Sequence, residues 1–205
     1  IIDRSFADMT VNVNLDNTIA SENGMSMIGD ISSQKFTVIA RGPTYLINSL
    51  KSENFNVYAS AASVDAPGEY DLEVVALPVD ANKGYEVLKV VPSTVKVSFD
   101  YIDTKELTVK ALAEGVTASE GLIAENSVVS GAESDTITIQ GPRTILNKID
   151  SVVAFTNVNK TLSASQTFDA TIKLYDKDNK ELPLENLTLS ATKVKVTVPI
   201  SKKKT

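Results

Sequence analysis

The carboxylates Asp71 and Glu73 come closest to a catalytic pattern in this sequence. They stand two residues apart, and Asp169 repeats the position of Asp71 in the second half of the chain. In glycosidases, paired carboxylates act as acid and base, but they must face each other across a cleft and one must have a raised pKa. Both side chains lie on the polar side of an alternating run, residues 70–76. We therefore interpret them as a charged outer face that discourages edge pairing.

Two further motifs resemble sites only in part. Ser32 and Lys35 have the Ser-x-x-Lys spacing of serine acylases, but they precede a β-like run at 36–39, and the companion Ser-Asp-Asn and Lys-Thr-Gly motifs are absent. A solvated loop is the better interpretation. The turn from Asp176 to Asn179 begins like a calcium loop, yet the sixth position of that loop is Glu181 instead of Gly. We favour a polar hairpin turn there, with a bound cation as the alternative.

Histidine and cysteine are both absent from the sequence. Without cysteine there are no disulfides, no thiolate chemistry and no zinc–thiolate sites. Without histidine the commonest general base, the Ser–His and Cys–His pairs and the commonest transition-metal ligand are also missing. We therefore expect no catalytic residue, no metal site and no cofactor.

The charge balance excludes nucleic acid as a partner. The sequence has 26 acidic and 20 basic residues, a net charge of -6, and phosphate binding requires clustered Lys and Arg. The basic run 202–204 is interpreted as a solvated tail, with contact to anionic lipid or cell-wall polymer as the alternative. With 42% hydrophobic and 22% charged residues, the composition is that of a soluble globular protein.

The chain contains an internal repeat. At an offset of about 99 residues, 42–50 returns as 141–149 and 95–99 returns as 194–198; near the same offset, 9–11 echoes 107–109 and 70–74 echoes 168–172. Because the echoes keep one order, each half carries a complete fold. We predict two domains, residues 1–102 and 103–205, each close to the usual size of about 100 residues.

Alternation with period two predicts strands in both repeats. The strands are 70–76, 95–99, 168–175 and 194–198, with the apolar residues on one face. Turns are expected at 66–68, 80–84 and 176–180, where Pro, Gly, Asn and Asp gather. The predicted fold class is therefore mainly β.

The repeated Gly-Pro pair predicts one short helix in each domain. Pro43 and Pro142 suit the first helical position, and the apolar residues that follow have helical spacing over about two turns. Gly42 and Gly141 would allow the preceding strand to turn sharply into the helix.

The junction between the repeats is short. Tyr101, Ile102, Asp103 and Thr104 form this linker, which has no Gly, Pro or Ser. A linker of this kind is not a flexible coil. We therefore expect the two domains to form an elongated rod, and we expect a Gly/Ser insertion between Asp103 and Thr104 to weaken any signal passed along it.

Tyrosines are the better candidates for recognition, because a Tyr ring can be buried while its hydroxyl meets a partner. The six are Tyr45, Tyr58, Tyr70, Tyr85, Tyr101 and Tyr175. For each of them we favour packing in the core or at the domain junction. Tyr70 is expected to point inward and Tyr175 outward, and the binding surface remains unknown.

The ordered motifs resemble the YbbR domain. They are the Gly-Pro turn into a helix, a Val-rich segment that ends in Val64-Asp65, the strand 69–74 and the closing segment 92–97. A second copy runs from Gly141-Pro142 to 191–196, with Asn159 in place of Asp65 and Ala191 in place of Pro92. The resemblance carries over no catalytic residue.

This resemblance implies two tandem YbbR-like β domains of the CdaR family, the membrane-anchored bacterial regulators of the diadenylate cyclase that makes cyclic di-AMP. It implies a membrane helix upstream of Ile1, a location on the extracytoplasmic face of the cell membrane, and the cyclase as partner, with a cell-wall component as a further candidate. The function implied is non-enzymatic regulation and binding. The alternative is a cell-surface structural or adhesive module. An enzyme would need a carboxylate pair that faces a cleft.

Overall fold

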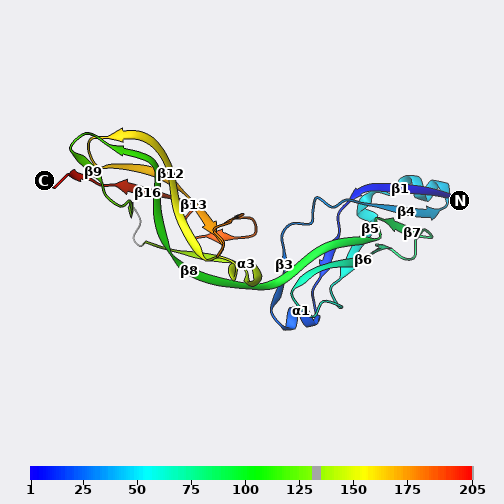
Figure 1. Ribbon diagram of the computed structural model, residues 1–205. Coiled ribbons are helices and arrows are strands. Elements are labelled where there is room, and N and C mark those ends of the chain that lie inside the picture. The colour runs from blue at the N-terminus through cyan, green and yellow to red at the C-terminus, as the bar shows by residue number, and fades with distance from the viewer. Residues whose placement is uncertain (131–134, 205) are drawn as a thin grey trace. The chain divides into compact units, whose positions relative to one another are not determined.

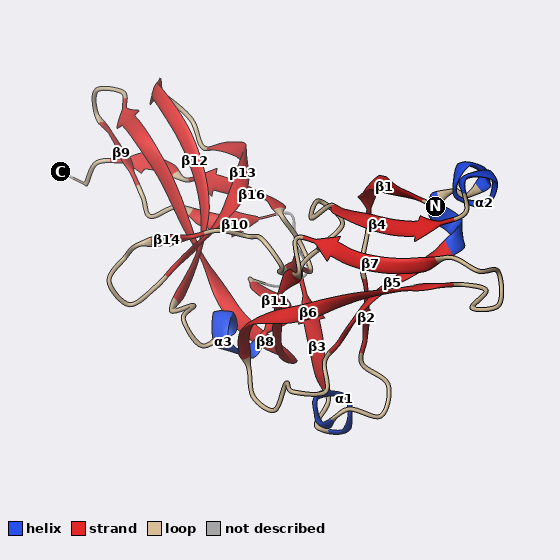
Figure 2. Cartoon of the chain, turned by 90° about the vertical axis from the view of Figure 1, so that its right-hand side faces the viewer, coloured by secondary structure: helices blue, strands red, loops and turns tan. Residues whose placement is uncertain are grey.

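The structure is a computed structural model, and it describes residues 1–130 and 135–204. Strands make up most of the chain, as Figure 2 shows in red, so the mainly β prediction is confirmed. The chain divides into two compact units, Ile1–Tyr101 and Ile102–Thr205, and Figure 1 colours them from blue to green and from green to red.

The first unit contains two sheets. Its elements are β1 (Ile2–Met9), β2 (Asn12–Asn14), α1 (Ile19–Glu22), β3 (Met25–Ile28), β4 (Phe36–Gly42), α2 (Thr44–Ser49), the 3-10 turn η1 (Ser52–Asn54), β5 (Phe55–Ser60), β6 (Gly68–Pro78), β7 (Glu86–Val91) and the start of β8 (Thr94–Ala118). One sheet has the order β1-β4-β7; in the other, β8-β6-β5-β2 lie side by side and β3 pairs with β8.

The second unit continues along β8. Its further elements are β9 (Leu122–Ala124), β10 (Val128–Ser130), β11 (Thr136–Pro142), α3 (Arg143–Leu146), β12 (Ser151–Leu162), β13 (Gln166–Tyr175), β14 (Glu181–Leu182), β15 (Thr188–Leu189), β16 (Lys193–Val198) and β17 (Ile200–Lys202). The order β10-β16-β13-β12-β8 forms its main sheet, while β11 pairs with β8 and β15.

The two units share one set of strand pairings. Four antiparallel pairs of the first unit have counterparts in the second: β1–β4 corresponds to β8–β11, β5–β6 to β12–β13, β6–β8 to β13–β16, and β3–β8 to β10–β16. The parallel pair β2–β5 corresponds to β8–β12. In the second unit, the single strand β8 therefore takes the places that β1 and β2 fill in the first.

Each unit buries its own apolar cluster. In the first unit, Val95, Val97 and Phe99 are at most 1% exposed, which confirms the inward face that alternation predicts. In the second, Leu174 and Val196 are fully buried. Each such side chain contributes about 1.5–3 kcal/mol of transfer free energy, so these alternating strands supply most of the driving force for folding.

The glycines before α2 and α3 serve a purpose other than the expected one. Neither Gly42 nor Gly141 has a positive φ, so the sharp turn does not require their conformational freedom. They provide space instead: a Cβ on Gly42 would lie 3.1 Å from Cβ of Tyr85, and one on Gly141 would lie 2.5 Å from Cδ2 of Leu187. The close approach of neighbouring side chains therefore favours glycine at both positions, most strongly at Gly141.

The helices also differ from the prediction. Pro43 and Pro142 directly precede the first helical residue as N-caps. The helix α3 is one turn long, shorter than the expected two, and the first unit contains an additional helical turn, α1. Thr18 caps α1, because its Oγ1 accepts a hydrogen bond from the Ser21 N–H at 3.2 Å.

The junction residues lie within β8. Tyr101 pairs with Met25 in the first unit, whereas Ile102 already pairs with Pro142 in the second. Asp103 and Thr104 continue the pairing with β11, opposite Gly141 and Gln140. Every linker residue is therefore held in a strand pair of one unit or the other.

One basic side chain closes the C-terminal end of the helix in each unit. In the first, Arg4 Nη1 donates to the carbonyls of Ile47, Asn48 and Leu50 at 3.1–3.4 Å. In the second, Lys105 Nζ donates to the carbonyls of Leu146 and Ile149 at 3.3 and 2.7 Å. Both cations satisfy carbonyls that a helix end leaves without intrahelical partners, and they oppose the negative end of its dipole.

We expect Arg4→Met and Lys105→Met each to lower the unfolding free energy of its own unit by about 1 kcal/mol, because the carbonyls lose a charged donor. Hydrogen exchange of the amides of each unit, followed in urea, measures the change. Lys148→Met is the control, since Lys148 is exposed and an exposed substitution of this kind stays within about 0.5 kcal/mol. Equal effects of Lys105→Met and Lys148→Met would contradict the capping role.

Candidate functional site

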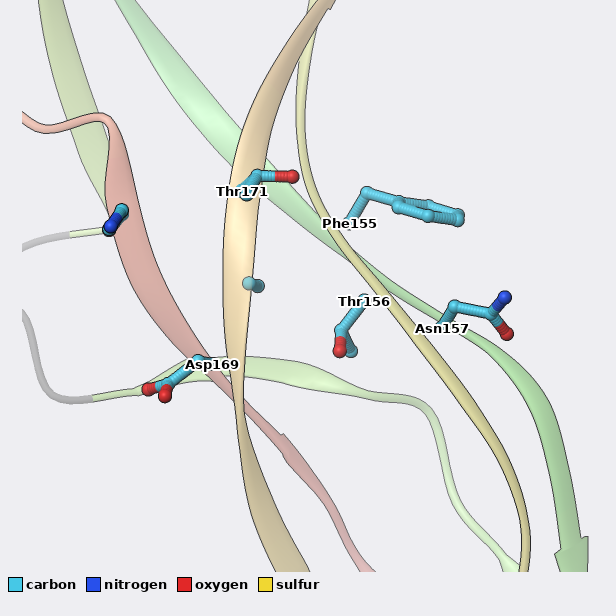
Figure 3. A pocket seen from close by; sticks show the side chains of 7 residues that line it. Phe155, Thr156, Asn157, Asp169 and Thr171 are labelled. Carbon is cyan, nitrogen blue, oxygen red and sulfur yellow. The ribbon is translucent and has the colours of Figure 1, made fainter.

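A groove opens in the second unit where two paired strands separate. The pairing of β12 with β13 runs from Ser151 opposite Tyr175 to Phe155 opposite Thr171. Beyond that point β12 and β13 are no longer paired with each other: β12 continues along β8, and β13 remains paired with β16. The groove has a volume of about 490 Å³ and is lined by Phe155, Thr156, Asn157, Asp169, Ala170, Thr171 and Lys193. Figure 3 shows Phe155 and Asn157 on one strand, with Asp169 and Thr171 on its neighbour.

The first unit has a groove at the equivalent place. There the pairing of β5 with β6 ends at Ala59 opposite Val74. The groove has a volume of about 290 Å³, and its lining includes Tyr58, Ser60, Ser63, Asp71 and Glu73. Asp71 is opposite Lys96, as Asp169 is opposite Lys195 in the second unit, so the two grooves occupy corresponding sites on the repeated fold.

Side chains from four strands form a row across the outer face at the second groove. Lys193 is opposite Thr171, Thr171 is opposite Phe155, and Phe155 is opposite Leu112. Because directly opposite residues share a face of the sheet, this row combines a cation, a hydroxyl and two apolar groups. Leu112 is 44% exposed, so the apolar end of the row is open to solvent.

The charges around the second groove are only partly paired. Lys195 Nζ lies 3.3 Å from Asp169 Oδ1, with both side chains largely exposed. Lys173 Nζ lies 4.2 Å from the centroid of the Phe155 ring, a cation–π contact. Within the described residues, Lys193 has no ion pair. The side of the groove formed by β13 and β16 therefore has an excess of positive charge.

The carboxylates singled out in the sequence lie at the first groove. Asp71 and Glu73 both line it, and both are exposed. The nearby Lys96 forms its ion pair with Glu69, with 3.2 Å between Nζ and Oε1. A catalytic general acid depends on an apolar environment that disfavours its charged form. Neither carboxylate lies in such an environment, so the arrangement is that of a charged outer face.

The Ser-x-x-Lys segment lies in the loop between β3 and β4. The Gln34 side chain within it donates to the carbonyl of Lys96 at 2.8 Å and accepts from its N–H at 3.1 Å. The Ser32 N–H donates to Asp30 Oδ1 at 2.8 Å, which lowers the pKa of that carboxyl. These contacts attach the loop to the edge of β8 and give Ser32 a structural role.

The acidic turn at Asp176 is held by its own backbone. Asp176 Oδ1 accepts hydrogen bonds from the N–H groups of Asp178 and Lys180, both at 2.9 Å, and Asn179 adopts a left-handed φ of 58°. Among the residues that the structure describes, no group of three or more acidic side chains is placed to hold a metal ion. The contacts at Asp176 are those of a polar hairpin turn.

The tyrosines divide into packing and surface residues. Tyr85 is buried and donates from its hydroxyl to the Asn54 carbonyl at 3.0 Å, and burial raises the pKa of its phenol. Tyr70 packs edge-on to Phe99, with ring centroids 6.0 Å apart, so its inward prediction holds. Tyr45 is 81% exposed. Tyr58 is half-buried at the first groove, and Tyr101 and Tyr175 are half-buried within strands.

The residues at the second groove were not singled out from the sequence. Phe155 provides the signal that could have identified them, because it stands at an outward position between the inward residues Ala154 and Thr156. An aromatic ring at an outward position offers a large apolar surface beside the polar residues of that face. The separation of β12 from β13, by contrast, leaves no pattern in either strand.

The described residues thus form two β units of the same connectivity, each with an open groove on the outer face of its sheet. The fold is therefore that of a tandem β-domain protein. Residues 107–198 match the model of the YbbR-like protein family, so the second unit carries a YbbR-like domain. This match confirms the resemblance to the YbbR domain that was noted in the sequence for residues 107–198. No curated protein matches the chain.

Two solved structures are similar to the chain. The crystal structure of a YbbR-like protein from Streptococcus pneumoniae is 13% identical, with a TM-score of 0.46, and the match covers 98% of this chain and 96% of that one. The solution structure of a protein from Streptococcus thermophilus is 21% identical, with a TM-score of 0.34, over 51% of this chain and 89% of that one. Across the described ranges, no helix has the length and apolar character needed to cross a membrane.

Proposed function

We propose that this protein is a non-enzymatic, extracytoplasmic binding module that regulates a membrane diadenylate cyclase and so controls the synthesis of cyclic di-AMP. The YbbR-like match at residues 107–198 carries the proposal. The two open grooves support a binding role, because they present charged and hydrogen-bonding side chains to solvent. The absence of histidine and cysteine from the sequence leaves few means of nucleophilic or metal-assisted chemistry.

Control would act through the chain that joins the two units to the membrane anchor expected upstream of Ile1. A ligand can shift a regulatory equilibrium only by binding one state more tightly than the other. The strand pairing of residues 101–104 supports this route. Each of these residues is paired with a strand of one unit or the other, so the joining segment contains no unpaired loop.

Co-purification tests the partnership. The full-length protein, isolated from membranes under mild detergent, is expected to retain the diadenylate cyclase. Recovery of a cell-wall or host ligand without cyclase would overturn the proposal and favour the adhesive alternative.

An insertion at the junction tests the coupling. Asp103 and Thr104 are paired with β11, so an insertion between them would also damage the second unit. A Gly-Gly-Ser insertion between Tyr101 and Ile102 falls where the pairing passes from β3 to β11. We expect it to change cellular cyclic di-AMP by about fivefold or more, the lower end of typical allosteric coupling.

The same insertion between Asn82 and Lys83 is the control, since it lies in an exposed turn of the first unit. It should leave cyclic di-AMP unchanged. If the junction insertion also leaves the cyclic di-AMP level unchanged, although the protein is present at its normal amount, the coupling is refuted.

A further inference from the structure

The two grooves hold corresponding positions but differ in charge. The strand pairings define which residues correspond. In the second unit Lys193 is opposite Thr171; at these positions the first unit has Thr94 opposite Glu73. Likewise, Lys173 is opposite Val153, where the first unit has Val75 opposite Tyr58. On the neighbouring strand β8, Lys110 is opposite Val153, at the position where Asn12 is opposite Tyr58 in the first unit. The second unit thus has three lysines at sites where the first unit has Thr, Val and Asn.

The repeated Asp–Lys strand pair does not account for these lysines. Asp169 is opposite Lys195, with which it forms an ion pair at 3.3 Å, and Asp71 is opposite Lys96 in the first unit, where Lys96 forms its ion pair with Glu69. A lysine opposite this aspartate is therefore common to both units. The lysines at 110, 173 and 193 come in addition, and Thr171 replaces the carboxylate of Glu73. A difference confined to one face of one repeat points to a ligand of that face.

We propose that the groove between β12 and β13 binds a short glycan that carries a carboxylate or a phosphate. Lys193 stands next to Thr171 across the strands, and Lys173 follows Thr171 on the same face of β13. Two ammonium groups and a hydroxyl at one place suit an anionic oxygen group, since charge-assisted hydrogen bonds are the stronger kind. This inference rests on the proposed binding role of the protein.

The rest of the lining suits a sugar. The side chains of Asn157, Asp169 and Thr171 offer both donors and acceptors to hydroxyl groups. Phe155, beside the exposed Leu112, gives an apolar wall for the carbon face of a ring, and its contact with Lys173 keeps that cation at the groove. A volume of about 490 Å³ lies within the range of small-ligand sites.

Other anionic partners fit the groove less well. Nucleic acid is disfavoured by the net charge of -6. A lipid surface is broad and flat, whereas the groove lies between two strands and includes the carboxylate of Asp169. An acidic peptide could use the lysines, but it would leave the hydroxyl-binding side chains without a matching group.

Calorimetry with the whole 205-residue protein tests the proposal, with digalacturonate and glucose 6-phosphate as probes. At least one of the two should bind, and the dimethyl ester of digalacturonate, which lacks the charge, should bind at least tenfold more weakly. Lys193→Ala and Lys173→Ala should each reduce affinity by about tenfold. Lys96→Ala in the first unit is the matched control and should leave the affinity unchanged. Circular dichroism verifies that the variants fold.

A transfer of the site sharpens the test. The triple variant Glu73→Thr, Val75→Lys, Thr94→Lys gives the first groove the counterparts of Thr171, Lys173 and Lys193, and it should bind a second equivalent of the probe. Equal binding of the ester, no binding of either probe at millimolar concentration, or binding only of hexaglutamate or of phosphatidylglycerol vesicles would each overturn the proposal. Because the cyclase is absent from this assay, failure here is distinguishable from failure of the regulatory role.

Discussion

Phe99→Ala is expected to destabilise the first unit by about 3–5 kcal/mol and to leave the second unit folded. Phe99 is 1% exposed and packs edge-on to Tyr70, so its removal leaves a cavity that neighbouring strands cannot easily fill. A domain of about 100 residues has only 5–15 kcal/mol of stability, so this loss brings the unit close to unfolding. Residue-resolved hydrogen exchange in urea measures both units in one experiment.

The separate response follows from the two cores. The apolar cluster around Phe99 lies within the first unit, and the cluster around Leu174 and Val196 lies within the second. Leu174→Ala is the matched variant, because Leu174 is fully buried, and it should reverse the pattern at a cost of about 2–5 kcal/mol. Simultaneous loss of protection in both units with either variant would show a single cooperative core and contradict this view.

The strands were predictable because burial of one sheet face imposes alternation on the sequence. The set Leu72, Val74 and Ala76 and its counterpart Ala170, Ile172 and Leu174 are buried as expected. Short edge strands such as β2 and β3 were not predicted. At three or four residues they carry too few alternations to be recognised, and they form only because β5 and β8 provide partners.

The helical parts show a different limit of sequence reasoning. The Gly-Pro signal located α2 and α3 correctly, but it gave the wrong reason for the glycines. Dihedral freedom is a local property, whereas the need for space at Gly141 arises from Leu187, which lies far along the chain. The extra turn α1 has only four residues and depends on its cap at Thr18. It has no longer helical periodicity by which the sequence could reveal it.

The candidate site was outside the reach of local patterns. Sequence reasoning found Asp71 and Glu73 and placed them correctly on an outer face, yet it could not show that a groove lies beside them. The groove exists because β12 follows β8 while β13 follows β16 beyond the pair Phe155–Thr171. Such a separation depends on the partners of each strand, and these become visible only when the sheet is assembled.

Gly141→Ala is expected to destabilise the second unit by about 1–3 kcal/mol, the usual cost of overpacking. The new Cβ would lie 2.5 Å from Cδ2 of Leu187 and 3.0 Å from the carbonyl oxygen of Asn186. One of these is the end of a flexible side chain, but the other is backbone, so rotation of Leu187 alone cannot relieve the contact. Chemical denaturation of the second unit, followed by its own amides, measures the loss.

A double-mutant cycle identifies the cause of that loss. Leu187→Ala removes the nearer of the two atoms, so the double variant should lose less stability than the sum of the single ones. Gly121→Ala is the contrasting control: its φ is +80°, nothing lies within 4 Å of its Cβ, and its cost should be independent of Leu187. Strict additivity of Gly141→Ala with Leu187→Ala would show that contact with this side chain is not the reason for glycine at the entry to α3.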